Sequence, residues 1–287
     1  MTERESIYRL LDSGDCRKVE QVGPYKIVRP APNAAYKIGD PAQWDGPDAT
    51  YIKSDQGGGD WQYRRSMPES FTIALPPFTV KIKLTPFGHI GIFPEQRTNW
   101  DFIFNLKASS DSPLEVLNLF AYSGVSTLAC LKRGFSVCHV DSAKGMVDWA
   151  AENARLSGLA KGKARWIVDD VLKFVRREVK RGRKYDGFIL DPPSFGRGAK
   201  GEVWKLERDL PELMEAMMAM CGGSPAFIIL SCFTLGFGPA NLDRILRTYL
   251  PHDAPGKFSS AELVIPESSG RVHPRGACAY YAAPGIS

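Results

Sequence analysis

Acidic residues and one thiol stand directly behind apolar runs in the second half of the chain. The runs cover residues 114–120, 136–140, 165–168, 185–190 and 226–230, and the last four end in Asp141, in Asp169-Asp170, in Asp191 and in Ser231-Cys232. Parallel strands bring their carboxyl ends to one edge of a sheet, where open α/β sheets bind ligands. Any single one of these residues also fits a helix cap or a turn. The repeated pattern indicates a ligand site.

The most informative of these strand ends is residues 191–195, an acid followed by two prolines, a serine and a phenylalanine. Proline fixes φ and donates no backbone hydrogen bond, so two prolines in succession give a rigid loop. We expect this loop to hold Asp191 and Phe195 against a bound molecule.

The elements that must position these residues alternate between strands and helical patterns from Trp100 onward, which is the signature of a doubly wound sheet. The first run leads into small residues at 121–127, where a ligand can approach the backbone and the first helical amides. Asp141 lies roughly 20 residues beyond this turn, the spacing at which an acid accepts hydrogen bonds from a ribose.

The first third of the chain has a different character. Residues 25–93 are rich in proline, glycine and aromatics and alternate in short runs such as 71–75 and 78–84. We therefore expect two domains, a small β-rich domain at residues 1–95 and an α/β domain at residues 96–287.

Composition limits the class of protein. The chain has 287 residues, 44% hydrophobic and 24% charged, which is ordinary for a soluble globular protein. Its first residues lack an apolar leader and no apolar run approaches bilayer length, so the sequence predicts a cytoplasmic protein without a membrane span. Six scattered cysteines without a C-x-x-C pair predict reduced thiols and no metal site. The net charge of +5 weakly favours an anionic partner.

Several segments occur in an order and at intervals that resemble a known family. They are residues 118–124, 141–144, 149–154, 169–171 and 191–195, with further similarity at 87–97 and 269–276. Together they resemble the class I S-adenosylmethionine-dependent methyltransferases, in particular the group that includes the large-subunit rRNA cytosine methyltransferases. The resemblance covers most of the chain beyond about residue 85. It implies a Rossmann-like, mostly parallel sheet of about seven strands.

The resemblance also assigns cofactor contacts. It implies S-adenosylmethionine binding by Gln96, Arg97, Ala121, Tyr122, Ser123, Gly124, Asp141, Ser142, Asp170, Val171, Asp191 and Pro192. The turn at 121–124 would line the methionine end, Asp141 would accept from the ribose, and Asp170 would accept from the adenine amino group. Gln96 and Arg97 would close over the cofactor carboxylate, although Arg97 fits an ordinary solvated arginine equally well.

The acceptor atom decides which other residues matter. Methylation of cytosine carbon five requires a nucleophile at carbon six, and the resemblance places Cys232 in that role with Asp191 contacting the base. Cys232 fits a buried packing residue equally well. Residues 233–237 also depart from the small, serine- and glycine-rich continuation of the cytosine enzymes. Without a thiolate, the acceptor would be a nitrogen held by Asp191 and the proline turn.

A basic, glycine-rich loop at residues 196–205 suits a phosphate backbone and an unstacked base. The predicted substrate contacts are Pro193, Phe195, Arg197, Lys200, Trp204 and Lys205. The alternative is a mobile lid with solvated charges.

These observations favour a methyltransferase that acts on RNA, with rRNA as the substrate and cytosine carbon five as the leading acceptor. The alternatives are methylation of a purine nitrogen, methylation of a small molecule, and a catalytically inactive cofactor-binding module. The intact acids and the turn at 191–195 argue against the last of these.

Overall fold

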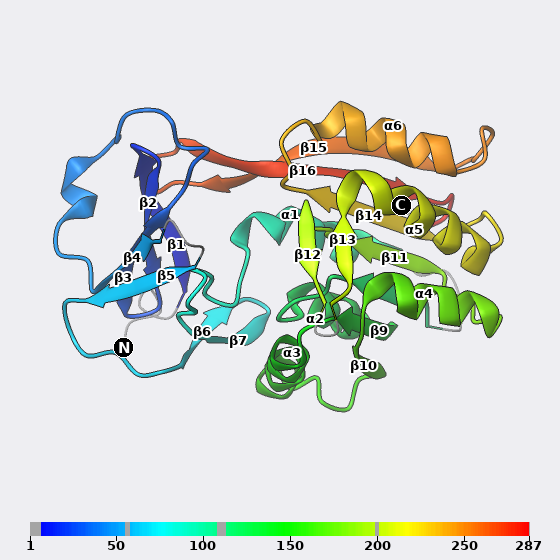
Figure 1. Ribbon diagram of the computed structural model, residues 1–287, viewed down its shortest axis with the longest axis horizontal. Coiled ribbons are helices and arrows are strands. Elements are labelled where there is room, and N and C mark those ends of the chain that lie inside the picture. Colours follow the sequence, from blue (N-terminus) through cyan, green and yellow to red (C-terminus); the bar gives the residue numbers. More distant parts are fainter. Residues whose placement is uncertain (1–6, 55–57, 108–112, 199–200, 287) are drawn as a thin grey trace. The chain divides into compact units, whose positions relative to one another are not determined.

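The computed structural model describes residues 7–54, 58–107, 113–198 and 201–286. Its backbone divides into two compact units (Figure 1). The N-terminal unit consists of Met1–Glu95 and Val264–Arg275, and the α/β unit consists of Gln96–Leu263 and Gly276–Ser287.

The N-terminal unit is β-rich, as the sequence predicts. Its five-stranded sheet has the order β1 (Tyr8–Gly14), β2 (Arg17–Val22), β3 (Tyr25–Pro30), β4 (Ala49–Lys53) and β5 (Gly59–Tyr63). Neighbours pair antiparallel except β3 and β4, which are parallel. A separate hairpin joins β6 (Phe71–Leu75) to β7 (Phe78–Ile82). The sheet begins well before residue 25, the point where the sequence suggested β structure.

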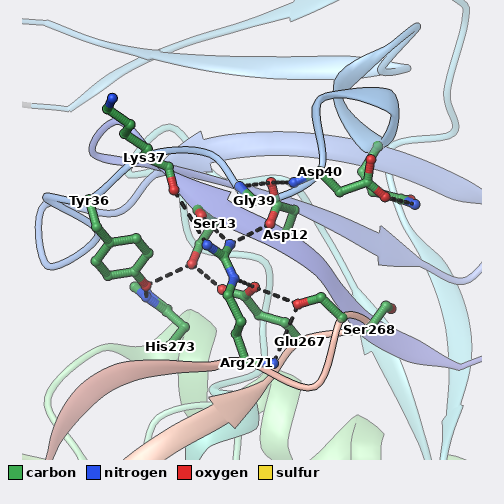
Figure 2. Close-up of polar contacts among 12 residues, drawn as sticks. Asp12, Ser13, Tyr36, Lys37, Gly39, Asp40, Glu267, Ser268, Arg271 and His273 are labelled. Atoms are coloured by element: carbon green, nitrogen blue, oxygen red, sulfur yellow. Dashed lines mark hydrogen bonds and ion pairs between the residues drawn. The ribbon is translucent and has the colours of Figure 1, made fainter.

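Residues 264–275 belong to the N-terminal unit, whereas the sequence assigned them to the second domain. The cause is a set of polar contacts with β1 (Figure 2). Arg271 forms ion pairs with Asp12 at 2.5 Å and with Glu267 at 2.8 Å, and both carboxylates are fully buried. The Ser268 amide donates to the Leu10 carbonyl oxygen at 2.9 Å. Because buried charges require partners, these contacts hold the segment against β1.

The α/β unit contains a seven-stranded, mostly parallel sheet, as predicted. Its order is β10 (Ala164–Val168), β9 (Ser136–Asp141), β8 (Glu115–Leu119), β11 (Gly187–Leu190), β14 (Phe227–Cys232), β16 (Val272–Ala282) and β15 (Lys257–Pro266). The first five strands are parallel, and β16 runs antiparallel to β14. Near-continuous apolar runs form these strands because both faces of a parallel sheet are covered.

Helices flank the sheet in two groups (Figure 1). One group consists of α1 (Arg97–Asn105), α2 (Val125–Lys132) and α3 (Lys144–Leu156), and the other of α4 (Val171–Lys180), α5 (Leu206–Cys221) and α6 (Pro239–Tyr249). The second group packs on an apolar cluster that includes Leu119, Phe188 and Leu213. The order of connection reverses between β8 and β11. Ligands bind at such a reversal, at the carboxyl ends of the strands.

Candidate active site

The turn after β8 lies at the reversal point, and three of its residues have positive φ values. Phe120 and Tyr122 have φ values of 55° and 49°, and Gly124 has a φ of 86°. A Cβ atom at Gly124 would lie 2.6 Å from the Cβ of Ala150, so only glycine fits there. The Asn153 side chain donates to the Ser123 carbonyl oxygen at 2.9 Å and fixes the turn from α3. Backbone held in such sparsely populated conformations concentrates at ligand sites.

Asp141, the last residue of β9, lies against this turn. Its Oδ2 accepts from the Tyr122 amide and its Oδ1 from the Ala143 amide, both at 2.9 Å. Burial raises the pKa of Asp141, and the backbone amides of Ala143, Tyr122 and Ser142 oppose that rise. The carboxylate is therefore fixed in place by backbone donors.

The next acid pair follows β10. Asp170 is the N-cap of α4, and its Oδ1 accepts from the Lys173 amide at 3.0 Å. Asp169 forms an ion pair with Arg177. Val171, the first residue of α4, is buried. The helix cap therefore uses one oxygen of Asp170.

The groups on this side of the site fit S-adenosylmethionine. One carboxylate ends β9 and the other follows the adjacent strand β10, and a carboxylate oxygen has room for a second hydrogen bond from a hydroxyl or an amino group. The close approach of Gly124 to Ala150 gives a turn without a side chain at the start of α2, where helical amides attract a carboxylate. Asp141 would hold the ribose, Asp170 and Val171 the adenine, and residues 121–124 the methionine end.

On the other side of the reversal point, Asp191 follows β11 and is held by side chains. Ser231 Oγ lies 2.9 Å from Asp191 Oδ1, and Gln96 Nε2 donates to Asp191 Oδ2 at 3.2 Å. Gln96 Nε2 also lies 3.3 Å from Ser231 Oγ. The carboxylate therefore has a fixed orientation at the carboxyl end of the sheet.

Sequence reasoning missed the residues that orient Gln96. Its Oε1 accepts a hydrogen bond from Asn99 Nδ2, and Asn99 Oδ1 accepts one from the Tyr280 hydroxyl at 2.6 Å. Tyr280 in turn accepts from the Cys278 thiol at 2.8 Å. This chain, called here the Tyr280 relay, points the Gln96 amide nitrogen at Asp191. Local sequence patterns do not predict contacts between residues that are so far apart along the chain.

Arg97, expected over the cofactor carboxylate, is about half exposed and forms an i,i+4 ion pair with Asp101 at 3.0 Å on α1. This contact matches the solvated-arginine alternative. A role for Arg97 at the cofactor stays a prediction.

Cys232, the last residue of β14, is 1% exposed and belongs to the large apolar cluster. Its Sγ accepts from the Thr234 amide at 3.4 Å. Burial and the nearby charge of Asp191 raise the pKa of Cys232, against the effect of hydrogen bonds from Thr234. The structure therefore holds this group as a thiol.

The segment after Pro192 forms a short hairpin of β12 (Phe195–Arg197) and β13 (Val203–Lys205). Phe195 is 49% exposed, and the Arg197 guanidinium lies 5.5 Å from the centre of its ring. Pro192 is buried, whereas Pro193 and Lys205 are exposed. Lys200 lies outside the described residues.

Trp204 does not fit the expected contact with a base, because it is only 6% exposed. Its Nε1 donates to the Pro193 carbonyl oxygen at 2.7 Å, and its ring packs edge-on against Phe120 at 4.8 Å. Trp204 therefore stabilises the proline turn through this hydrogen bond and this packing contact.

Over residues 7–54, 58–107, 113–198 and 201–286, no group of three or more His, Cys, Asp or Glu side chains could hold a metal ion. No helix in the same ranges is long and apolar enough to cross a membrane.

Comparison with known proteins agrees with this geometry. A family model of S-adenosylmethionine-dependent methyltransferases matches residues 68–236, more than half of the chain. A crystal structure of a SAM-dependent methyltransferase from Agrobacterium tumefaciens is similar over 96% of this chain and 90% of its own, with 34% identity and a TM-score of 0.89.

Two curated relatives carry more specific names. Ribosomal RNA large subunit methyltransferase K/L of Pseudoalteromonas atlantica is 36% identical over 131 residues, which make up 45% of this chain and 18% of that protein. Ribosomal RNA large subunit methyltransferase I of Aeromonas salmonicida is 36% identical over 110 residues, 38% of this chain and 27% of that protein. The chain thus matches only about a quarter or less of these relatives. The family match and the strand-end acids lead to one conclusion: the chain belongs to the S-adenosylmethionine-dependent methyltransferases.

Proposed function

We propose that this methyltransferase acts on RNA, with ribosomal RNA as its substrate. The curated relatives named above are ribosomal RNA methyltransferases. A net charge of +5 suits a polyanion. The observation that carries the proposal is the proline turn, where a clamped carboxylate, Asp191, is followed by an exposed aromatic ring and a guanidinium, Phe195 and Arg197. Exposed aromatics with arginine planes are how proteins hold unstacked RNA bases.

The residues of the chain contribute mainly position. Bound S-adenosylmethionine supplies a methyl group on a sulfonium, which leaves as a neutral thioether. Because this leaving group is already activated, the protein must bring the acceptor into line and exclude competing water. The backbone-held Asp141 and the turn at 121–124 would fix the cofactor, and Asp191 would fix the acceptor.

The acceptor that the geometry supports best is a nitrogen. Methylation at cytosine carbon five would need Cys232 as a thiolate, yet this side chain is 1% exposed and its pKa is raised by burial. A nitrogen needs no covalent activation. Asp191 would accept a hydrogen bond from an exocyclic amino group of the base, while Ser231 and Gln96 hold its two oxygens.

In this reaction the nitrogen forms a bond to the methyl carbon as the carbon–sulfur bond breaks. The sulfur keeps the electron pair, and the nitrogen then loses one proton to Asp191 or to water. Atoms and charge balance without a further reagent. Asp191 is therefore the proposed catalytic residue, and Gln96 and Ser231 are positioning residues.

RNA that carries 5-fluorocytosine separates the two acceptors. Carbon-five chemistry through Cys232 would trap a covalent adduct, because fluorine cannot leave as a cation after methyl transfer. We expect no adduct, and Cys232→Ala should keep methyl transfer within about threefold of the unmodified protein, since the buried thiol only packs. If an adduct does form, and Cys232→Ala abolishes both the adduct and turnover, then carbon five is the acceptor. Absence of methyl transfer to any RNA would favour a small-molecule acceptor.

A further inference from the structure

The N-terminal unit encloses a cavity that the proposed methyl transfer does not use. Its volume is about 290 Å³, and every residue of its wall belongs to that unit. Four cationic side chains contribute to the wall: Lys18, Arg29, Lys53 and Arg275. Lys18 and Arg29 are only 4% and 7% exposed. Charged residues are rarely buried unless something nearby compensates them.

A carboxylate behind the wall compensates part of this charge. Glu20 is fully buried, and it forms ion pairs with Lys18 at 2.8 Å and with Arg29 at 2.6 Å. Burial alone would raise the pKa of Glu20, but the charges of Arg29 and Lys18 lower it well below its usual range. Glu20 therefore stays ionised and holds both cations in fixed positions.

The two buried cations have more donors than these pairs use. An ammonium has three N–H donors and a guanidinium has five. Arg29 bonds to Glu20 through Nε and Nη2 and to the Gly88 carbonyl oxygen through Nη1. Arg275 pairs with Glu95, the acid in the wall, through Nε at 3.1 Å. Four cations against two acids, Glu20 behind the wall and Glu95 in it, leave an excess of positive charge at the cavity, which suits an anion.

Aromatic residues form another part of the wall. Tyr51, Phe87 and Phe93 contribute to it. The Tyr51 hydroxyl donates to the Pro86 carbonyl oxygen at 2.8 Å, which ties this ring to the loop before Phe87. Phe87 itself is 72% exposed. An exposed aromatic ring beside a positive cavity offers a face on which a base can stack.

We propose that this cavity binds one unstacked nucleotide of a single-stranded RNA segment, with its base on Phe87 and a phosphate at the cations of the wall. This inference rests on the proposed function only in naming RNA as the source of the nucleotide. Cations for the phosphate and an aromatic face for the base are the two requirements of sequence-tolerant binding to single strands. The cavity gives the N-terminal unit a role in holding the substrate.

Two exposed positions test the assignment without disturbing the buried cluster. Phe87→Ala should weaken binding of cytidine 5′-monophosphate and of a single-stranded oligoribonucleotide about tenfold, the usual effect of removing a stacking ring. Lys53→Gln should weaken RNA binding about threefold and lower the slope of log affinity against log salt by about 0.7. The matched controls are Tyr63→Ala, an exposed aromatic on β5, and Arg9→Gln, an exposed cation on β1. Neither residue lines the cavity.

The measurements are calorimetry for the mononucleotide and fluorescence anisotropy for the RNA, both on the full chain. The proposal is supported if both variants lose affinity and both controls keep it. It is overturned if the variants bind like the controls, or if inorganic phosphate binds as tightly as the nucleotide. The two proposals can fail separately. If the protein methylates no RNA but Phe87→Ala still weakens nucleotide binding, the proposed function is refuted and the nucleotide site stands.

Discussion

The candidate active site has a proposed cofactor side and a proposed acceptor side, and the two are built differently. On the cofactor side, around β8, β9 and β10, the backbone holds the functional groups: amides of Tyr122 and Ala143 hold Asp141, and the Lys173 amide is capped by Asp170. On the acceptor side, around β11 and β14, side chains hold Asp191, and its partners Gln96 and Ser231 lie 95 and 40 residues away along the chain.

Because of this difference, the two sides should tolerate different amino-acid substitutions. A group held by backbone amides keeps its place as long as the turn folds, and here the turn requires Gly124 and the Asn153 side chain. A group held by side chains depends on each of them, and each is open to substitution. The cofactor side can therefore remain constant while the acceptor side adapts to new substrates.

The largest effect should come from the acceptor side. Asp191→Ala should lower methyl transfer at saturating cofactor about 100-fold or more, because the acceptor loses its fixed partner. Cofactor affinity should change less than threefold. Single-turnover kinetics and calorimetry give the two values. Asp243→Ala, which removes a partly exposed acid paired with Arg247 on α6, is the control. Equal losses in turnover and in cofactor affinity would mean that Asp191 serves the cofactor side.

The next effect belongs to the cofactor side. Asp141→Ala should weaken S-adenosylmethionine binding by about 1 to 3 kcal/mol, the cost of leaving buried partners without a hydrogen bond. Turnover at saturating cofactor should stay within a few-fold. Calorimetry measures the affinity, and Asp148→Ala on the exposed face of α3 should leave it unchanged. Unchanged affinity in Asp141→Ala would remove this residue from the cofactor site.

A smaller loss should follow from Gln96→Ala. Asp191 keeps Ser231 but loses the amide at Oδ2, so we expect turnover to fall about tenfold with cofactor affinity intact. Gln96→Glu should be at least as harmful, since it sets two carboxylates beside each other. Asn241→Ala, which removes an exposed amide on α6, serves as control. A drop in cofactor affinity instead would support the role first predicted for Gln96 over the cofactor carboxylate.

The smallest effect should come from the far end of the Tyr280 relay. Tyr280→Phe removes the donor to Asn99 and should lower the free energy of unfolding by about 1 kcal/mol, or about 2 to 4 °C in Tm. Turnover should fall only about twofold, because Asn99 still contacts Gln96. Thermal unfolding and kinetics measure both. A loss of turnover as large as that of Gln96→Ala would show that the relay acts as a single unit.

The same difference explains what could be predicted from the sequence. The strand-end acids and the small-residue turn are local patterns, so the parallel sheet and the positions of Asp141 and Asp191 follow from the order of residues. The contacts of Asp191 with Gln96 and Ser231 join segments that no periodicity connects. The assignment of residues 264–275 fails for the same reason, since Arg271 reaches Asp12 from the opposite end of the chain.

Burial was the other property that local patterns could not give. Trp204 follows a basic, glycine-rich stretch and was expected to meet a base, yet Phe120 and the Pro193 carbonyl enclose it. Cys232 stands at a strand end like the acids, but it is buried as a member of an apolar cluster. Only the packing of segments far apart along the chain shows that these two side chains are buried.

Identification of the methylated nucleoside tests the central proposal most directly. RNA from cells that lack the protein would be incubated with the purified chain and S-adenosylmethionine carrying a labelled methyl group, then digested to nucleosides for mass spectrometry. We predict label on a base nitrogen, lost with Asp191→Ala and retained with Cys232→Ala. Label in 5-methylcytidine that disappears with Cys232→Ala would contradict the account.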